Sequence, residues 1–259
     1  MKRLILKITA FSALLITACS KSNSPTQLAP AANLTVSTNS VTYTIADSLN
    51  KAITFDWSLS NAGTQTNVVS GALQLSTDAS FAANVIPFAG NLTSLSLTVA
   101  QLNSLAAYMN VASTGMLYAR VQYEVQKSNG STAYINSPVK IITVNGVYSS
   151  SFGAVTGLSL YAQVPNTNNV LLTWTTIAEY NCTGFILRRS SDGGISWTNI
   201  SMVMTQAPNG NSSAPLTYTY SDLNLQPNSY IYQIVYLGGS GDVNYSNLTM
   251  VLIKVNSGS

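Results

Sequence analysis

The fold of this chain is decided by the stretch Ile53-Thr54-Phe55-Asp56-Trp57-Ser58-Leu59. Apolar side chains occupy every second position, which is the period of a strand with one buried and one wet face. Residues 71–76 and 117–125 alternate in the same way, and in the latter Arg120, Gln122 and Glu124 point away from the apolar face. Antiparallel sheets that pack one face on a core have this pattern, so we expect an all-β fold.

One short helix interrupts the strands of the first half. Thr98 can accept the N–H of Gln101 while the Gln101 side chain bonds back to Thr98, which is a capping box. Leu102, Leu105 and Met109 would then share one helix face. We expect this helix to close one end of a β-sandwich.

The second half also has a β pattern. Its expected strands cover residues 158–164, 170–174, 185–189, 230–236 and 248–255. A Ser-rich segment at 148–153 separates the two halves and is typical of a linker. We therefore expect two tandem β-sandwiches, a first module at 34–147 and a second module at 152–256.

Composition excludes some partners. Charged residues make up 7% of the 259 residues, against about 25% in an average soluble protein. Three of the eleven Lys and Arg residues lie at positions 2, 3 and 7, so eight remain against eight Asp and Glu in the rest of the chain. Without a basic cluster the chain cannot neutralise phosphates, and we expect no binding to nucleic acid.

The residues of common active sites are also scarce. The sequence has no histidine, and its eight carboxylates are scattered singly rather than paired as glycosidases require. No phosphate loop, calcium loop or nucleophile elbow is present. We therefore expect no enzymatic activity, no catalytic residues, no metal site and no cofactor. Cys182 is expected to be a small buried apolar side chain.

The N-terminal segment has the features of a bacterial lipoprotein leader. Residues 1–18 form a signal peptide, whose uninterrupted apolar part at 8–18 is shorter than the roughly 20 residues of a membrane span. Leu14-Leu15-Ile16-Thr17-Ala18-Cys19 resembles a lipobox. The resemblance implies lipid attachment at Cys19, a membrane anchor, and a flexible tether over residues 19–33.

Each module resembles a known family. The first carries a series of motifs in a fixed order: Phe55-Asp56-Trp57, Ala72 to Ser76, Asp78 to Phe81, Leu102-Asn103 and Tyr118 to Val121. This order is similar to the N-terminal immunoglobulin-like domain of SusE-type outer-membrane lipoproteins. The resemblance implies a place in the outer membrane, on its periplasmic or its cell-surface face, beside the proteins of a glycan-uptake system.

The second module is similar to a fibronectin type III domain, through Leu172-Thr173-Trp174, Phe185 to Ser190, and Leu225-Gln226-Pro227 before a tyrosine corner. Either Tyr230 or Tyr232 could be the corner tyrosine. The predicted fold class is thus two tandem immunoglobulin/fibronectin-like β-sandwiches after a lipoprotein signal peptide and tether.

Aromatic residues near turns are the candidates for a ligand surface. Trp197, Tyr148, Tyr180 and Tyr245 could be exposed and stack on sugar rings, whereas Trp57 and Trp174 lie mid-strand and are expected in the cores. The segment from Ser190 to Trp197 fits an Asp-box pattern, and we interpret it as a hairpin turn.

The sequence favours one function and leaves a second open. The favoured one is a non-enzymatic cell-envelope lipoprotein that binds a polysaccharide or assists glycan uptake. The alternative is a structural or adhesive surface lipoprotein that contacts other proteins and binds no glycan.

Overall fold

The structure, a computed structural model, describes residues 30–44, 46–60, 66–90, 92–127, 129–146 and 153–255. The predicted signal peptide, Cys19, most of the tether, and Tyr148 with most of the linker lie outside the described residues. Strands account for 61% of the structure and helices for 6%, which confirms the all-β class.

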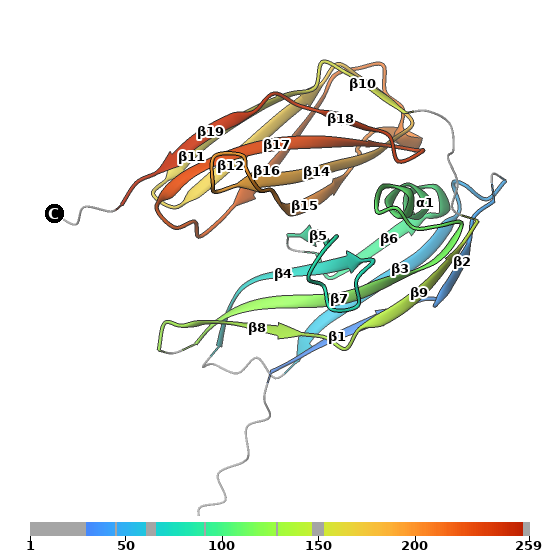
Figure 1. The fold of residues 1–259 in the computed structure, drawn as a ribbon, viewed down its shortest axis with the longest axis horizontal. Helices are drawn as coiled ribbons and strands as arrows, with labels where there is room; N and C mark the ends of the chain where they lie inside the picture. The colour runs from blue at the N-terminus through green and yellow to red at the C-terminus, as the bar shows by residue number, and fades with distance from the viewer. Residues whose placement is uncertain are drawn as a thin grey trace, which may run out of the picture.

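The first module is built from two sheets that face each other (Figure 1). One sheet has the order β1-β3-β6, and the other has the order β2-β9-β7-β4-β5 with β8 paired to β7. The elements are β1 (Ala31–Val36), β2 (Ser40–Thr42), β3 (Lys51–Ser60), β4 (Thr66–Ser76), β5 (Ile86–Ala89), β6 (Ser94–Thr98), α1 (Val99–Tyr108), β7 (Thr114–Lys127), β8 (Thr132–Asn136) and β9 (Lys140–Asn145).

Strand β3 has the alternation predicted for it. Ile53, Phe55 and Trp57 are buried, while Asp56 and Ser58 between and after them are exposed. Strand β7 behaves alike, with Leu117, Ala119 and Val121 fully buried in the same core. Burial of one face of each strand therefore joins the two sheets into a sandwich.

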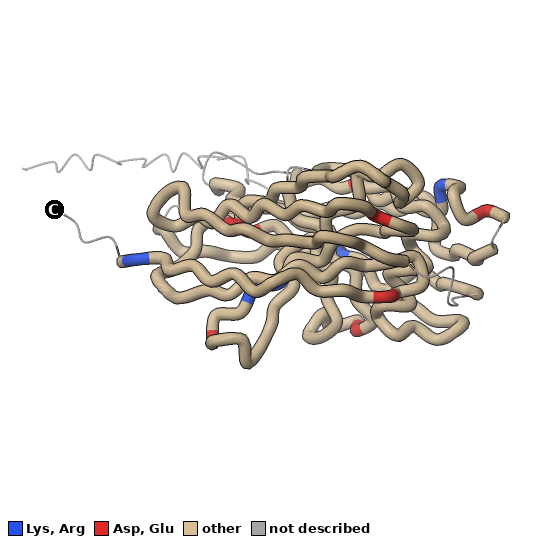
Figure 2. The backbone as a smooth tube through the Cα atoms, turned by 90° about the horizontal axis from the view of Figure 1, so that it is seen from above, with Lys and Arg blue, Asp and Glu red and all other residues tan. Residues whose placement is uncertain are grey.

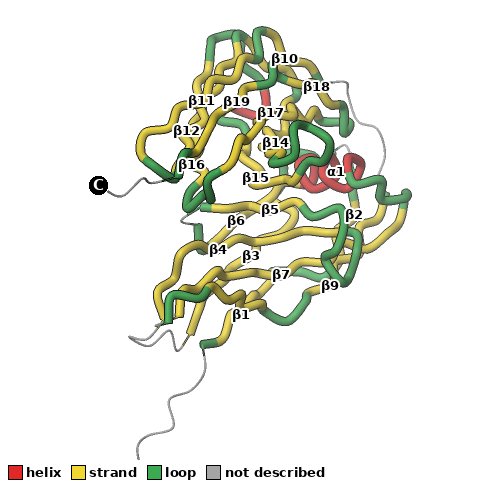
Figure 3. The backbone as a smooth tube through the Cα atoms, turned by 60° about the vertical axis from the view of Figure 1, so that its left-hand side comes forward, coloured by secondary structure: helices red, strands yellow, loops and turns green. Residues whose placement is uncertain are grey.

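Helix α1 begins as predicted, and it packs on the second module as well as on the first. The Gln101 N–H donates to Thr98 Oγ1 at 3.2 Å and the Thr98 N–H donates to Gln101 Oε1 at 2.9 Å, which confirms the capping box. The helix buries Leu102, Leu105 and Met109 in the core of the first module, as their shared face predicted. It lies between the two modules (Figures 1 and 3), and Ser104 Oγ donates to the Gly239 carbonyl of the second module at 2.7 Å.

The second module is another pair of facing sheets with a short ribbon at one end. Its sheets have the orders β11-β12-β16 and β15-β14-β17-β18, with β19 paired to β17, and β10 pairs with β13. The elements are β10 (Ala154–Thr156), β11 (Ser159–Asn166), β12 (Asn169–Thr176), β13 (Ala178–Tyr180), β14 (Cys182–Ser190), β15 (Thr198–Met204), η1 (Pro208–Gly210), β16 (Leu216–Asp222), β17 (Asn228–Gly238), β18 (Val243–Tyr245) and β19 (Thr249–Ile253).

Aromatic rings fill the core of the second module. The Trp174 ring stacks on Tyr218 at 5.3 Å between centroids and meets Phe185 edge-on at 5.8 Å. Trp174 is fully buried, as predicted. Cys182 is also buried, and burial raises the pKa of its thiol. Tyr230 is the corner tyrosine, because its hydroxyl donates to the Gln226 carbonyl at 3.0 Å.

The two modules pack directly on each other rather than following one another as separate beads. Ile186, Met202, Val235 and Leu237 of the second module belong to the hydrophobic cluster of the first. Strands β14 and β17 are consequently buried on both faces along their central residues. The core cluster of the first module therefore extends across the junction, while the second module keeps a separate core of its own around Trp174.

The outermost strands of two sheets meet at this junction. Asn199 on β15 donates from Nδ2 to the Val85 carbonyl at 3.2 Å, and the Ala89 N–H on β5 donates to Ser201 Oγ at 3.3 Å. Both β5 and β15 end their sheets. Each edge is therefore covered by the other through side-chain hydrogen bonds.

Charged residues are sparse over the whole fold (Figure 2). Among the described residues no helix is long and apolar enough to cross a membrane, and no three His, Cys, Asp or Glu side chains gather as metal ligands.

Candidate functional site

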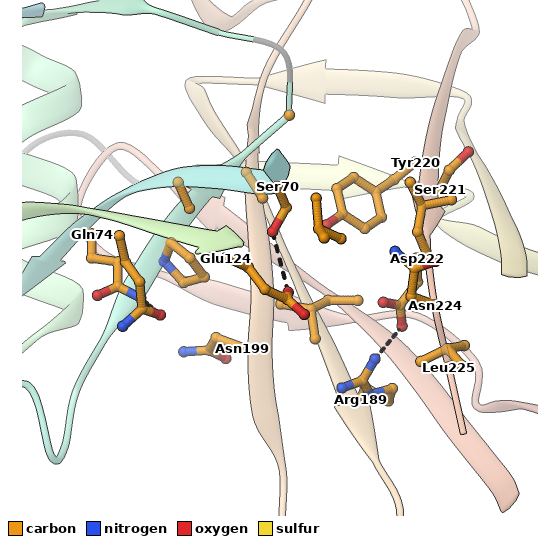
Figure 4. Close-up of a pocket in the computed structure, with 18 of the residues that line it drawn as sticks. Ser70, Gln74, Glu124, Arg189, Asn199, Tyr220, Ser221, Asp222, Asn224 and Leu225 are labelled. Carbon is orange, nitrogen blue, oxygen red and sulfur yellow. Dashed lines mark hydrogen bonds and ion pairs between the residues drawn. The ribbon is translucent and has the colours of Figure 1, made fainter. Parts of the chain in front are cut away.

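A cleft of about 530 Å³ lies between the modules. One wall is the outward face of β4 and β7, with Tyr134 of β8. The other wall is the side of the second sandwich where β15 and β16 end their sheets (Figure 4). The volume falls within the range of about 300–1,000 Å³ that small-ligand sites occupy, and domain junctions are common places for such sites.

The first wall carries a row of three side chains on neighbouring strands. In the strand register Glu124 on β7 lies opposite both Ser70 on β4 and Tyr134 on β8. Ser70 Oγ donates to Glu124 Oε2 at 3.3 Å. Tyr134 is 61% exposed, so its ring is available as an apolar surface beside the carboxylate.

Amide side chains continue this wall in a hydrogen-bonded chain. Arg120 Nε donates to Gln74 Oε1 at 2.7 Å, and Gln74 Nε2 donates to Gln122 Oε1 at 3.3 Å. Gln122 Nε2 in turn donates to Asn136 Oδ1 at 3.0 Å. These bonds fix which end of each amide is the donor, so the wall presents an ordered set of donors and acceptors.

An ion pair forms part of the opposite wall. Arg189 Nη1 contacts Asp222 Oδ2 at 2.6 Å, and the Tyr232 hydroxyl donates to the same oxygen at 2.8 Å. Burial opposes the positive charge of Arg189, but the charge and hydrogen bond of Asp222 outweigh it and raise the pKa of Arg189. The guanidinium also lies over the Tyr230 ring at 5.3 Å.

Neutral polar groups complete the second wall. Burial, helped by the charge of Asp222, raises the pKa of Tyr220 to about 12, so its phenol stays protonated and can donate a hydrogen bond. Asn199, Asn224 and Gln226 add amide groups to the lining. The described lining thus combines hydroxyls, amides and tyrosine rings with three charged side chains.

Two of the predicted ligand residues lie together, but outside this cleft. Trp197 and Tyr245 flank the Arg188 guanidinium, whose carbon is 4.5 Å and 5.0 Å from their ring centroids. Arg188 Nε also donates to Gln233 Oε1 at 3.0 Å. Tyr108 at the end of α1 is close by, and burial raises its pKa, with Tyr245 contributing.

The remaining candidates are separate. Tyr180 is 59% exposed, its carbonyl accepts the Tyr236 hydroxyl at 2.8 Å, and it does not line the cleft. Tyr148 and Cys19 lie outside the described residues. The Asp-box segment is the hairpin between β14 and β15, as predicted, with the Asp192 carboxylate accepting from Ser196 and Ser190. These hydrogen bonds lower the pKa of Asp192.

Sequence reasoning missed the cleft itself. The outward orientation of Gln122 and Glu124 was readable from the alternation of β7, but nothing in that strand indicates what lies opposite. Tyr134 lies in a short strand, and the sequence around it does not indicate that its ring faces a cleft. The pairing of the two walls depends on how the modules dock.

Comparison with known proteins gives a family match within residues 20–122, which include most of the first module. Residues 20–122 match the family model described as SusE outer membrane protein. Among solved structures the chain is similar to the FN1–FN3 domains of chicken CNTN1, with 10% identity, a TM-score of 0.31, and coverage of 88% of this chain and 68% of that one. The comparison with curated proteins gives no match. The family match confirms the resemblance read from the motifs, and residues 20–122 of this chain are similar to the SusE outer membrane protein family.

Proposed function

We propose that this protein is a non-enzymatic outer-membrane lipoprotein that binds a glycan in the intermodule cleft as an accessory component of a Sus-like uptake system. The observation that supports this most is the cleft lining, where amides, hydroxyls and tyrosine rings converge from both modules. Sugar hydroxyls both donate and accept hydrogen bonds, and amide side chains offer both groups at fixed spacing. The SusE-family match supports the outer membrane as the location.

The absence of catalysis is part of the proposal. Two carboxylates line the cleft, Glu124 and Asp222. Asp222 is bound by Arg189 and Tyr232, so its charge is already compensated. Glycoside hydrolysis needs one carboxyl group as acid and a second as base or nucleophile. We propose that this lining binds its ligand and does not cleave it.

The membrane anchor rests on the lipobox-like residues that end at Cys19. Mass spectrometry of the mature N-terminus of the native protein tests it. We expect a chain that begins at a diacylglyceryl-modified Cys19. An unmodified start at another residue would remove the anchor from the proposal.

Glycan binding is tested by affinity electrophoresis of the detergent-solubilised protein through gels that contain soluble polysaccharides. We expect Tyr134→Ala to weaken retention about tenfold, equivalent to 1.4 kcal/mol, because the variant removes an exposed ring from the cleft wall. Tyr161→Ala is the matched control, since Tyr161 is 59% exposed and lies outside the lining.

The same gels test the aromatic cluster around Arg188. Trp197→Ala or Tyr245→Ala would reduce retention if the ligand stacks there instead of in the cleft. A loss in these variants with full retention by Tyr134→Ala would move the binding site away from the cleft.

A structural or adhesive role is the alternative, and one surface favours it. Leu248, Met250 and Leu252 are 58%, 70% and 57% exposed along or beside β19. Exposed apolar rows of this kind are used in protein–protein contacts. Failure of the protein to retain any polysaccharide would favour this alternative.

A further inference from the structure

The charged side chains of the cleft do not balance. Its described lining contains Glu124, Arg189 and Asp222. Arg189 and Asp222 neutralise each other through their 2.6 Å contact. Glu124, on the facing wall, has the neutral hydroxyl of Ser70 as its hydrogen-bond donor at 3.3 Å. The lining therefore carries one uncompensated negative charge.

Strand β7 carries two cations, Arg120 and Lys127, and neither forms an ion pair with Glu124 or lines the cleft. Lys127 lies three residues after Glu124, so strand alternation places it on the opposite face of β7. Arg120 lies four residues before Glu124 on the same strand and is outside the lining. Its Nε donates to Gln74, and its guanidinium lies over the Phe81 ring at 4.2 Å. Arg120 is thus held by Gln74 and Phe81, whereas Glu124 lines the cleft beside Ser70 (Figure 4).

Glu124 also has a position suited to reading a ligand. Tyr134, the exposed aromatic of this wall, is directly opposite it in the strand register. Side chains in such a pair are about 5 Å apart at Cβ, so a ring stacked on Tyr134 would have its substituents within reach of the carboxylate. A ligand hydroxyl there would donate a charge-assisted hydrogen bond, whereas a ligand carboxylate or sulfate would meet a like charge.

We propose that Glu124 is a specificity-determining residue that makes the cleft select uncharged polysaccharides and reject anionic ones. This inference rests on the proposed function of the cleft. The composition of the chain does not predict this selectivity. Outside its leader the chain has as many cationic as anionic side chains, so its net charge would not repel an anionic polysaccharide.

The experiment uses polysaccharides in pairs that share a backbone and differ in charge. Suitable pairs are dextran with dextran sulfate, hydroxyethyl cellulose with carboxymethyl cellulose, and methyl-esterified with de-esterified homogalacturonan. Binding of each to the full-length protein is measured at 20 mM and 500 mM salt. For the pair whose neutral member binds, we expect the charged member to bind at least tenfold more weakly at low salt and less so at high salt, because salt screens the repulsion.

Variants test whether the Glu124 carboxylate causes the preference for neutral over anionic polysaccharides. Glu124→Gln keeps the shape and should reduce the neutral-to-charged ratio about tenfold, and Glu124→Lys should invert it. Asp56→Asn is the matched control, because Asp56 on β3 also accepts a cross-strand serine, Ser94, but lies outside the cleft. Unchanged urea midpoints would show that the variants fold.

The outcomes separate the inference from the function. Equal binding of both members of a pair by the wild type, or an unchanged ratio in Glu124→Gln, overturns the inference and leaves glycan binding in place. Binding of no member of any pair by the wild type overturns both. A reduced ratio in Glu124→Gln with an unchanged ratio in Asp56→Asn supports the assignment.

Discussion

At the scale of single residues, the Arg189–Asp222 pair links the stability of the second module to its cleft. The Arg189 and Asp222 side chains are 25% and 10% exposed, so water solvates them poorly and each charge is stabilised mainly by the other. We expect Arg189→Met to lower the unfolding free energy by about 3 kcal/mol, because it leaves a largely buried carboxylate whose remaining donor is Tyr232. Urea unfolding followed by tryptophan fluorescence measures this.

A second substitution tests the cause. The double variant Arg189→Met with Asp222→Asn removes both charges and keeps an acceptor for the Tyr232 hydroxyl, so most of the lost stability should return. If the double variant is less stable than Arg189→Met alone, the destabilisation has another origin, such as lost packing of Arg189 on the Tyr230 ring.

The sequence predicted the burial of single residues correctly where that burial depends on the local chain alone. Trp57 and Trp174 are in the cores, as their mid-strand positions predicted. Cys182 is buried, as predicted for a free cysteine. The cleft residues could not be assigned in the same way. Glu124 and Asp222 lie almost a hundred positions apart in the sequence, and only the docking of two modules brings their strands to one cavity.

At the scale of elements, helix α1 depends on its first residue. Thr98→Ala should destabilise the protein by about 1 kcal/mol, because the variant leaves the Gln101 N–H without its acceptor. Thr98→Ser keeps the hydroxyl, so it should lower the stability by only about 0.3 kcal/mol. Thermal unfolding of the two variants measures the difference, and equal losses would show that the methyl group of Thr98 matters rather than the cap.

The sequence predicted a strand correctly where one face of that strand is exposed to solvent, because its apolar and polar residues then alternate. Strands β3 and β7 alternate and were placed correctly. Strands β14 and β17 contain unbroken apolar runs, Phe185-Ile186-Leu187 and Ile234-Val235-Tyr236-Leu237. Such runs are typical of strands covered on both faces. They were the available signal that the second module packs on a neighbour.

At the scale of the whole molecule, one of the two hydrophobic clusters of the described residues joins the modules. The cluster that includes Phe55 and Val121 extends into the second module through Ile186, Met202 and Val235. Edge strands β5 and β15 protect each other at the same junction. An unfolded first module would therefore expose one face of the second, and the two should unfold together although their sheets are separate.

Hydrogen-exchange mass spectrometry in increasing urea checks this, because peptides from β3 and β12 report the two modules separately. In the wild type we expect both peptides to lose protection at the same urea concentration. Met202→Asp places an unpaired charge at a site that is 3% exposed, and should separate the two transitions by weakening the junction. Met250→Asp on β19, where the side chain is 70% exposed, should leave them coincident. Separate transitions in the wild type would mean that the junction contributes little, and that the cleft it forms is able to open.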